Sequence, residues 1–440
     1  MSSSNVSLAP ADPYMPDQGT EAYRVLHYDL ELDYKLASNR LSGRAVLDVT
    51  AQCEMAAVVL DLAGLRVVKV LLDGKKVRRF NQRAEQLVVT PETALVPGKT
   101  SRLEIRYEGN PEPRRGLWGD VGWEELTDGV LVAGQPNGAP SWFPCNDHPR
   151  HKSSYRIAVT TDADYRAVSN GRLTSHTRKS SRETWVYEQD EPMATYLATV
   201  QIGRYALISM SDNGPGVPQK VAVSAELSTA ALAGLRRQPE MMRLFVRSFG
   251  PYPFEDYTVV VADDDLEIPL EAQSLSIIGR NHLTPDWESQ RLIAHELSHQ
   301  WFGNSLTLAA WRDIWLHEGF ACYAEWLWSE ESGSHSVVQR ARSAWKGLAE
   351  DEEDLIIGDP GPELMFDDRV YKRGALALHV LRQACGDIAF FALLHEWTRT
   401  RSHGSVSTAE FLLTGKRVTG LDVEALLHPW LFQEELPALP

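Results

Sequence analysis

The feature that most constrains this chain is the pentapeptide H-E-L-S-H at residues 295–299. On an α-helix, residues four apart lie on one face with about 5–6 Å between their β-carbons, so the imidazoles of His295 and His299 can bind one metal ion. Glu318 follows His299 by nineteen residues, at the start of a second stretch with helical periodicity. The chain must therefore fold so that two helices face each other where these three side chains meet.

The three candidate ligands favour a catalytic zinc ion over a structural one. Structural sites usually use four protein ligands, mostly Cys and His, whereas a His, His, Glu set leaves one position open for water. We therefore predict one Zn²⁺ ion bound by His295, His299 and Glu318. Glu296 would lie beside it, where its carboxylate can take a proton from a zinc-activated water and pass it to the leaving amine. The simplest alternative is a surface helix that carries these residues by chance.

Local signals define both helices. The first is predicted over residues 285–301, with Thr284 as N-cap, Pro285 at the first helical position and Gly303 just past the end. No Gly or Pro interrupts residues 288–301, which suits a helix that holds metal ligands rigidly. The second helix is predicted over 317–331, with Glu318 in its first turn. That turn is expected to face the first helix and to complete the site.

The composition is that of an ordinary globular protein. Of the 440 residues, 43% are apolar and 24% are charged, and the length predicts two or three domains, each large enough to bury a core. The net charge is −16 and the isoelectric point is near 5.3. Because there is no surplus of Lys and Arg to neutralise phosphates, neither nucleic acid nor an anionic membrane is expected as a partner.

The cysteines and the N-terminus bear on the compartment. Four cysteines are scattered along the chain without a C-x-x-C pair, which indicates reduced thiols in a reducing compartment. The N-terminus lacks a basic segment followed by an apolar stretch, and nowhere do eighteen apolar residues run together. We therefore expect a soluble cytoplasmic protein. The sequence indicates no oligomeric state.

The periodicity of the chain changes near residue 212. Before it, segments of alternating apolar and polar residues predict strands; these are 26–36, 44–51, 67–72, 87–90, 103–107, 155–160 and 196–202. Residues 212–218 are interpreted as a linker, and helical periodicity prevails after them; the helices are expected at 229–249, 285–301, 317–331, 335–350, 371–384, 387–400, 407–414 and 421–433. We predict a multidomain α+β fold, with an N-terminal antiparallel β-sandwich-like domain over residues 1–211 and a mostly helical catalytic domain over 212–440.

Several further motifs occur along nearly the whole chain. They are D-P-Y at 12–14, H-Y-D-L at 27–30, W-F-P-C-N-D at 142–147, T-Y-L at 195–197, W-F-G-N at 301–304, W-L-H-E-G-F-A at 315–321 and Y-K-R-G at 371–374. With these motifs the chain resembles the aminopeptidase N family of gluzincin zinc metallopeptidases, in the short bacterial form without the C-terminal helical domain. The resemblance implies that the helical domain is a thermolysin-like catalytic domain.

The resemblance also implies roles for residues outside the zinc motif. Glu271 stands where the family's G-x-M-E-N segment has the glutamate that pairs with the free α-amine of a substrate, and Gln135 stands where the family has a second contact to that amine. Tyr371 matches the phenol that donates a hydrogen bond to the oxyanion. A substrate without a free amine would leave a buried carboxylate unpaired, which predicts strong discrimination against it.

The chain departs from the family pattern next to Glu271. Residues 268–270 are Ile-Pro-Leu instead of Gly-Ala-Met, and Ala272 replaces Asn. Since Pro269 has no N–H to donate, contacts between this edge strand and a peptide backbone are expected to differ. His317, beside the third ligand, is interpreted as a hydrogen-bonding packing residue. Glu325 has two equal interpretations: a carboxylate that holds a ligand imidazole in its correct tautomer, or an ordinary helix-surface carboxylate.

The residues and the resemblance together predict a monozinc aminopeptidase that acts on peptides with a free N-terminus. Three alternatives remain. A zinc endopeptidase would use the same ligands, but Glu271 would block its cleft. A bifunctional epoxide hydrolase and aminopeptidase belongs to a branch with a C-terminal domain, which we do not expect in this chain. A scaffold that has lost its metal is disfavoured, because all three ligands, Glu296 and Tyr371 are present.

Overall fold

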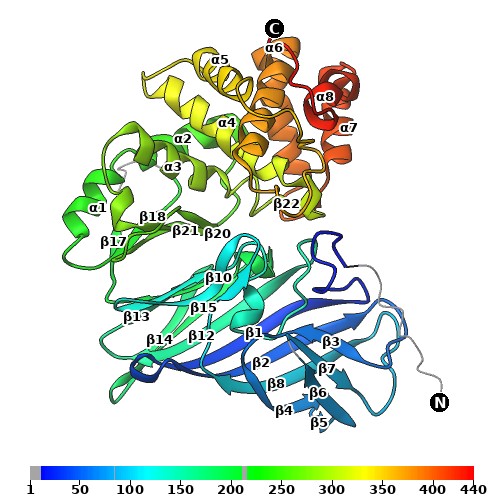
Figure 1. The fold of residues 1–440 in the computed structure, drawn as a ribbon. Helices are drawn as coiled ribbons and strands as arrows, with labels where there is room; N and C mark the ends of the chain where they lie inside the picture. Colours follow the sequence, from blue (N-terminus) through cyan, green and yellow to red (C-terminus); the bar gives the residue numbers. More distant parts are fainter. Residues whose placement is uncertain (1–10, 84, 211–215) are drawn as a thin grey trace. The chain divides into compact units, whose positions relative to one another are not determined.

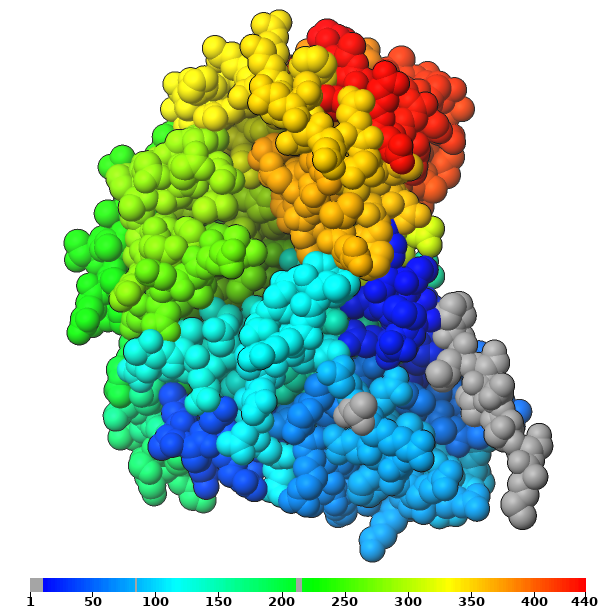
Figure 2. Space-filling model, viewed as in Figure 1, coloured from blue at the N-terminus to red at the C-terminus, as the bar shows by residue number. Residues whose placement is uncertain are grey.

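The computed structural model describes residues 11–83, 85–210 and 216–440. They form two compact units: the N-terminal unit ends at Leu207 and also includes Ala222–Ala225 and Ala262–Asp264, and the catalytic unit holds the other described residues (Figure 1). In the space-filling view, atoms coloured blue to cyan belong to the N-terminal unit and atoms coloured yellow to red to the catalytic unit (Figure 2). The predicted boundary between residues 211 and 212 lies outside the described residues.

The N-terminal unit is built from β-sheets, as predicted. An eight-stranded sheet has the order β14-β15-β12-β1-β2-β8-β4-β5, a five-stranded sheet the order β13-β16-β11-β10-β9, and a three-stranded sheet the order β3-β7-β6. The strands are β1 (Tyr23–Lys35), β2 (Arg40–Ala51), β3 (Val58–Asp61), β4 (Arg66–Leu72), β5 (Lys75–Lys76), β6 (Arg79–Arg83), β7 (Gln86–Thr90), β8 (Thr100–Gly109), β9 (Arg114–Gly116), β10 (Gly119–Leu126), β11 (Gly129–Ala133), β12 (Lys152–Asp162), β13 (Arg166–Ser169), β14 (Arg172–Lys179), β15 (Arg182–Ala194) and β16 (Val200–Gly203).

Two details of this unit differ from the prediction. The pairing of β1 with β12 is parallel, so the large sheet is mixed and not purely antiparallel. The register of β1 against β2 shifts between Val25 and Tyr28, which is a β-bulge. The bulge turns Leu26 outward, where it is 53% exposed, although strict alternation from Leu26 to Leu36 would have buried it.

The catalytic unit is mostly helical, as predicted, but it also contains most of a five-stranded sheet of order β17-β18-β19-β21-β20. Its strands are β17 (Ala206–Ser209), β18 (Gln219–Val223), β19 (Tyr257–Ala262), β20 (Leu270–Ala272) and β21 (Leu275–Gly279). The helices are α1 (Ser228–Gly234), α2 (Gln238–Phe249), α3 (Trp287–Ser298), α4 (Trp315–Glu331), α5 (Val337–Leu348), α6 (Asp368–Thr400), α7 (Thr408–Thr419) and α8 (Val423–Phe432). The sequence prediction missed this sheet, because β19 is buried along its length and carries no alternation.

Helix α6 combines two predicted helices. Gly386 has a φ of 78° and breaks the helical path between them, which agrees with the prediction of separate helices at 371–384 and 387–400. By length and composition alone α6 could cross a membrane. The break at Gly386 and the packing of α6 against α4 in the catalytic unit favour a core helix (Figure 1).

Helices α4 and α6 lie close together at two glycines. A β-carbon placed on Gly319 would lie 2.8 Å from Cα of Gly374, and one on Gly374 would lie 2.8 Å from Cα of Gly319. The two backbones therefore touch directly. Glu318 precedes the first glycine and Tyr371 lies one helical turn before the second, so this contact brings both side chains to the same region of the unit.

The start of α6 is also tied to the C-terminal helix. The buried guanidinium of Arg373 donates hydrogen bonds to the backbone carbonyls of Trp430, at 2.8 Å, and Pro429, at 2.9 Å, in the last turn of α8. It also donates to the carbonyl of Glu434, at 2.7 Å, beyond that helix. A cation at the carbonyl end of a helix satisfies groups that the helix leaves without partners. Arg373 thus fixes the segment that carries Tyr371.

Candidate metal centre

Helix α3 presents the first two candidate ligands. It begins two residues later than predicted: Asp286, and not Thr284, is the N-cap, and its carboxylate accepts a hydrogen bond from the backbone N–H of Ser289 at 2.9 Å. Thr284 instead contacts the hydroxyl of Ser289 at 2.5 Å. Both residue types suit an N-cap, so the sequence alone did not separate them. The helix ends at Ser298, and His299 is its C-cap.

The structure brings His295, His299 and Glu318 together, as predicted. Their ligand atoms all lie within 4.8 Å of one another, and all three side chains are buried. The Oε2 atom of Glu318, on α4, is 3.3 Å from Nε2 of His295 and 3.6 Å from Nε2 of His299. We call these three residues the zinc cluster. Two imidazole nitrogens and one carboxylate oxygen are a donor set that suits Zn²⁺.

The outer nitrogens of both imidazoles face acceptors. His295 Nδ1 donates to Oε1 of Glu325 at 2.8 Å, and His299 Nδ1 donates to the backbone carbonyl of Phe302 at 2.9 Å. A proton held on Nδ1 leaves the Nε2 lone pair free for a metal. Both lone pairs therefore point into the zinc cluster, and of the two interpretations of Glu325 the structure supports the one in which it orients a ligand.

Two further carboxylates lie beside the zinc cluster. Ligand atoms of Glu271, Glu296 and His299 are also within 4.8 Å of one another. Glu296 is only 5% exposed, and among the described residues its Oε2 has no hydrogen-bond partner. Burial raises the pKa of Glu296 well above its usual range; His295 opposes this rise, and Glu271 adds to it. A carboxyl whose pKa is raised in this way is suited to take up and release a proton.

Glu271 lies on the edge strand β20, which among the described strands pairs with β21 alone. Burial raises the pKa of Glu271, and its Oε1 has no hydrogen-bond partner among the described residues. The strand is held just after Glu271 by two polar side chains: the carbonyl of Ala272 accepts from Gln300 Nε2 at 3.1 Å and from Asn304 Nδ2 at 2.9 Å. The sequence analysis gave no role to these two amides.

Tyr371 lies in the first turns of α6, with its ring centroid 6.0 Å from that of His295 and the two planes 19° apart. Burial raises the pKa of Tyr371, and the carboxylates of Glu318 and Glu271 raise it further. The phenol therefore keeps its proton and is able to donate a hydrogen bond. His317 has a different partner: its Nε2 accepts a hydrogen bond from the backbone N–H of Leu308 at 2.9 Å. Its interpretation as a hydrogen-bonding packing residue is thus supported.

Gln135, the remaining predicted site residue, belongs to the N-terminal unit, between β11 and the short helix Ala139–Ser141. Its Nε2 is buried and has no hydrogen-bond partner among the described residues. Its contact with a substrate amine stays a prediction.

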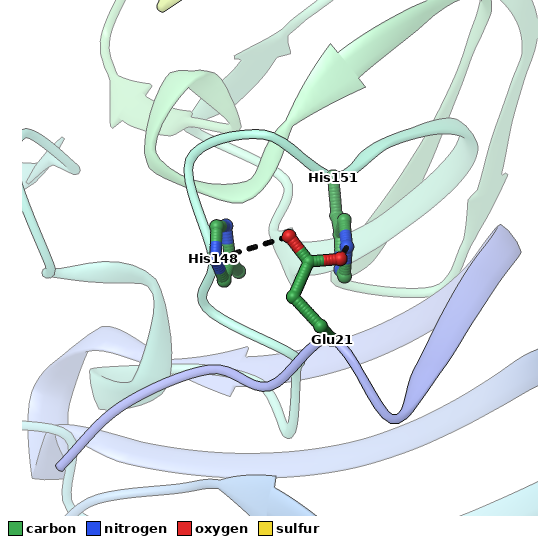
Figure 3. Close-up of side chains that lie close together, drawn as sticks. All are labelled: Glu21, His148 and His151. Carbon is green, nitrogen blue, oxygen red and sulfur yellow. Dashed lines mark hydrogen bonds and ion pairs between the residues drawn. The ribbon is translucent and has the colours of Figure 1, made fainter. Parts of the chain in front are cut away.

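The N-terminal unit contains a second group of metal-ligating side chains, which the sequence analysis did not find. Ligand atoms of Glu21, His148 and His151 also lie within 4.8 Å of one another. Figure 3 shows the carboxylate of Glu21 between the two imidazoles: Oε2 is 3.1 Å from Nε2 of His151, and Oε1 is 3.6 Å from Nε2 of His148. We call these residues the N-terminal cluster. The H-x-x-H spacing of the histidines is a weak signal, and nothing in the sequence links them to Glu21.

Comparisons with known proteins agree with the geometry of the zinc cluster. The Peptidase M1 N-terminal domain model matches residues 24–197, and the Peptidase family M1 domain model matches residues 234–430. A curated relative, the leucyl aminopeptidase of Saccharolobus solfataricus, is 24% identical over 94% of this chain and 54% of its own length. Aminopeptidase M1 of Arabidopsis thaliana is 22% identical over 94% of the chain and 50% of its length. The chain thus spans about half the length of the curated relatives it matches.

Solved structures match over nearly their whole length. The M1 zinc metallopeptidase of Deinococcus radiodurans is 33% identical, with a TM-score of 0.89 and 98% of both chains covered. A mutant of that enzyme bound to a Tyr-Ser-Ala substrate has a TM-score of 0.90 at 32% identity, again with 98% of both chains covered. From these matches and from the metal-binding geometry of its catalytic unit, we conclude that the chain belongs to peptidase family M1 and has the two-domain structure of a zinc metallopeptidase.

Proposed function

We propose that this protein is a zinc-dependent aminopeptidase, which removes the N-terminal residue from peptides with a free α-amine. The observation that carries the proposal is the half-buried side chain of Glu271, whose Oε1 is buried and which offers a ligand atom within 4.8 Å of those of Glu296 and His299. A carboxylate without a partner beside the reaction centre suits a substrate with a positive charge next to its first peptide bond. The names of the curated relatives support this reading, and similar M1 structures were solved with Tyr-Ser-Ala, L-tryptophan and L-arginine bound.

Glu296 is proposed as the general base. When bound at the zinc cluster, Zn²⁺ supplies a Lewis acid that polarises a carbonyl and lowers the pKa of water. Glu296 accepts the proton of the attacking water and then passes it to the leaving amine. Its burial and its hydrogen-bond-free Oε2 support this role, because such an oxygen is available to a water or a substrate group.

Glu271 is proposed to select the free N-terminus, with Gln135 as a second contact to the same amine. A peptide with a blocked N-terminus would leave the carboxylate of Glu271 desolvated and unpaired, which is costly. By the family resemblance, the side chain of Glu271 would also block the cleft of an endopeptidase. These two effects favour an exopeptidase over an endopeptidase.

Tyr371 is proposed to stabilise the oxyanion that forms when the first carbonyl is attacked. One such donor typically contributes about 2.7–4 kcal/mol to the transition state. Tyr371→Phe is therefore expected to lower kcat by about 10²- to 10³-fold while KM changes little, since the interaction is made mainly in the transition state. Steady-state kinetics measure both quantities, and an unchanged kcat would remove Tyr371 from the mechanism.

A matched pair of substrates tests the proposed function. Aminoacyl fluorogenic substrates should be cleaved, and the same compounds with an N-acetyl group should not. Glu296→Gln should keep its zinc and lose about 10²- to 10⁴-fold in turnover, as expected for removal of a general base. Equal cleavage of free and blocked substrates would instead favour an endopeptidase, and full activity in zinc-loaded Glu296→Gln would remove Glu296 as the base.

We also propose that the protein is cytoplasmic. Its four cysteines, Cys53, Cys145, Cys322 and Cys385, are all free thiols, which is consistent with a reducing compartment. Fractionation of the native host tests this proposal: recovery outside the cytoplasmic fraction would contradict it.

A further inference from the structure

We propose that Arg291 is a positioning residue of the metal centre: it fixes the carboxylate of Glu325, which in turn holds His295 in the orientation of a ligand. The inference rests on the same zinc cluster as the proposed function. It concerns how tightly the metal is held, and it does not depend on which substrate is cleaved.

The two oxygens of Glu325 are taken by two residues of the same helix. Oε1 accepts from His295 Nδ1 at 2.8 Å, and Oε2 lies 3.6 Å from a terminal guanidinium nitrogen, NH1, of Arg291. Arg291 and His295 are four residues apart and therefore share one face of α3. Two side chains of α3 thus contact a single carboxylate of α4, and one of these side chains is the predicted zinc ligand His295.

The contact with Arg291 helps to fix the carboxylate of Glu325. The terminal torsion of a glutamate side chain is soft, so one hydrogen bond alone does not fix the plane of its carboxylate. Glu325 is also only 6% exposed, and a buried carboxylate needs a nearby positive charge. A metal-bound imidazole is neutral, so apart from the metal ion the positive charge near Glu325 comes from two other groups. They are Lys372, which acts electrostatically from α6, and Arg291, whose NH1 lies 3.6 Å from Oε2.

The guanidinium of Arg291 is in turn oriented by an exposed carboxylate. Arg291 Nε donates to Oε2 of Glu288 at 2.7 Å, and Glu288 is 71% exposed. A line of contacts therefore leads from an exposed carboxylate through Arg291 and Glu325 to His295. The alternative is that Arg291 forms only an ordinary surface pair with Glu288, three residues away on the same helix, which would leave metal binding unaffected.

Zinc affinity, measured by competition with a chromogenic chelator, distinguishes these roles. Loss of a direct partner of a metal ligand typically costs about 10- to 100-fold in affinity, which is the expectation for Glu325→Gln. Arg291 acts one step further out, so Arg291→Gln should cost about three- to tenfold, and Arg291→Lys should recover part of that loss because it keeps the charge. Arg399→Gln is the matched control: Arg399 pairs with Glu396 at 2.7 Å in the same three-residue spacing on α6, far along the helix from Tyr371.

A double-mutant cycle gives the decisive outcome. If Arg291 acts through Glu325, Arg291→Gln should weaken zinc binding in the wild-type background and have no further effect in the Glu325→Gln background. Cobalt-substituted protein provides a second readout, since a shifted visible absorption spectrum in Arg291→Gln would report altered ligand geometry. The proposal is overturned if Arg291→Gln binds zinc as tightly as Arg399→Gln, or if its effect is undiminished without Glu325. Where Arg291→Gln yields no folded protein, Arg291→Lys takes its place in the same cycle.

These measurements are independent of peptide cleavage. Failure of the aminopeptidase assay with normal zinc binding would remove the proposed function and leave the role of Arg291 intact. Normal cleavage with unaltered zinc affinity in every Arg291 variant would leave the proposed function intact and remove the role of Arg291.

Discussion

The zinc cluster and the N-terminal cluster contain the same chemical groups at similar distances. Each has two histidines and one glutamate whose ligand atoms lie within 4.8 Å of one another. In the zinc cluster one oxygen of Glu318 lies 3.3 Å and 3.6 Å from the two Nε2 atoms, and in the N-terminal cluster the two oxygens of Glu21 lie 3.1 Å and 3.6 Å from one Nε2 atom each. By distance alone, both would be metal sites.

The two clusters differ in the partners of the Nδ1 atoms, on the side of each imidazole ring opposite to Nε2. In the zinc cluster both Nδ1 atoms face acceptors, a carboxylate and a carbonyl. In the N-terminal cluster both face donors: His151 Nδ1 is 3.0 Å from the amide Nδ2 of Asn146, and His148 Nδ1 accepts from the backbone N–H of Arg150 at 3.2 Å. The amide of Asn146 is oriented by the N–H of Thr20, which donates to its Oδ1 at 2.8 Å.

These partners assign opposite tautomers to the two clusters. An imidazole that accepts at Nδ1 carries its proton on Nε2, where a metal would have to bind. His151 therefore donates to Glu21 at 3.1 Å, His148 Nε2 faces the same carboxylate at 3.6 Å, and Arg150 adds a guanidinium contact to it at 3.3 Å. The N-terminal cluster is a hydrogen-bonded latch between the segment before β1 and the loop before β12. Whether two histidines and a glutamate form a metal site thus depends on the hydrogen-bond partners of the Nδ1 atoms as well as on the ligands themselves.

The largest expected effect separates the clusters by metal content. His299→Ala should lose zinc and about 10³-fold or more in activity, because a bound metal supplies several kcal/mol to the transition state. His151→Ala should keep one zinc per chain and full activity, since its ring donates to Glu21. Elemental analysis and the fluorogenic assay measure both. A second zinc in the wild type that disappears in His151→Ala would contradict the assignment of tautomers.

The next effect concerns the group behind His151. Asn146 is 1% exposed, and its amide donates to the carbonyls of Thr20 and Tyr23, each at 3.0 Å. Asn146→Asp places an unpaired carboxylate among acceptors and should destabilise the N-terminal unit by about 3–5 kcal/mol, the usual penalty for a buried charge without a partner. Thermal unfolding measures the loss.

A matched control exists for this substitution. Asn110 also donates to two carbonyls, those of Ser38 and Asn39, but it is exposed. Asn110→Asp should therefore change stability by about 0.5 kcal/mol or less. Equal losses in the two variants would show that burial behind His151 is not what matters, and zinc content should stay unchanged in both.

The smallest effect is a pH dependence of the latch. Burial lowers the pKa of His148 from 6.5 to about 4; His151 and Arg150 also lower it, and Glu21 opposes them. Because the folded pKa lies below the unfolded one, the unfolded chain takes up its proton first as the pH falls, and stability is lost between about pH 6.5 and pH 4. The loss should amount to about 1–3 kcal/mol in the wild type.

Hydrogen exchange of the latch amides measures this slope. The N–H groups of Gly19 and Thr20 donate to Asp61 and Asn146, so they report whether the segment before β1 stays bound. His148→Gln keeps a donor without a titrating ring and should flatten the profile over this range. Asp61 and Asp147, with pKa values raised by burial to about 7 and about 6, titrate in both proteins and cancel in the difference. Parallel profiles would rule out His148 as the source.

The sequence predicted those parts of the molecule that depend on local order. Helical spacing alone placed His295 and His299 on one face, and the change of periodicity near residue 212 predicted the β domain and the helical domain. Boundaries were less certain where two residues suit the same role, as with Thr284 and Asp286 at the start of α3. The bulge that exposes Leu26 could not be predicted, because it depends on pairing with β2.

What the sequence could not supply is the environment of a side chain. Glu325 had two equal interpretations until its contact with His295 was known. Glu21 is separated from His148 by more than one hundred residues, so no spacing rule connects them. Deciding which cluster binds a metal required the donors and acceptors on the Nδ1 side of each ring, and these are backbone groups, the amide of Asn146 and the carboxylate of Glu325, whose contacts no motif predicts.

The contact between Gly319 and Gly374 has a consequence for redesign. Because main chain meets main chain there, no side-chain layer exists that could be trimmed or enlarged to adjust how far the phenol of Tyr371 reaches toward the site. Any methyl group added at either glycine would push apart the segments that carry Glu318 and Tyr371. An engineer who wants room for a bulkier transition state would have to alter the path of α6 itself, for instance through its break at Gly386, and leave the crossing point untouched.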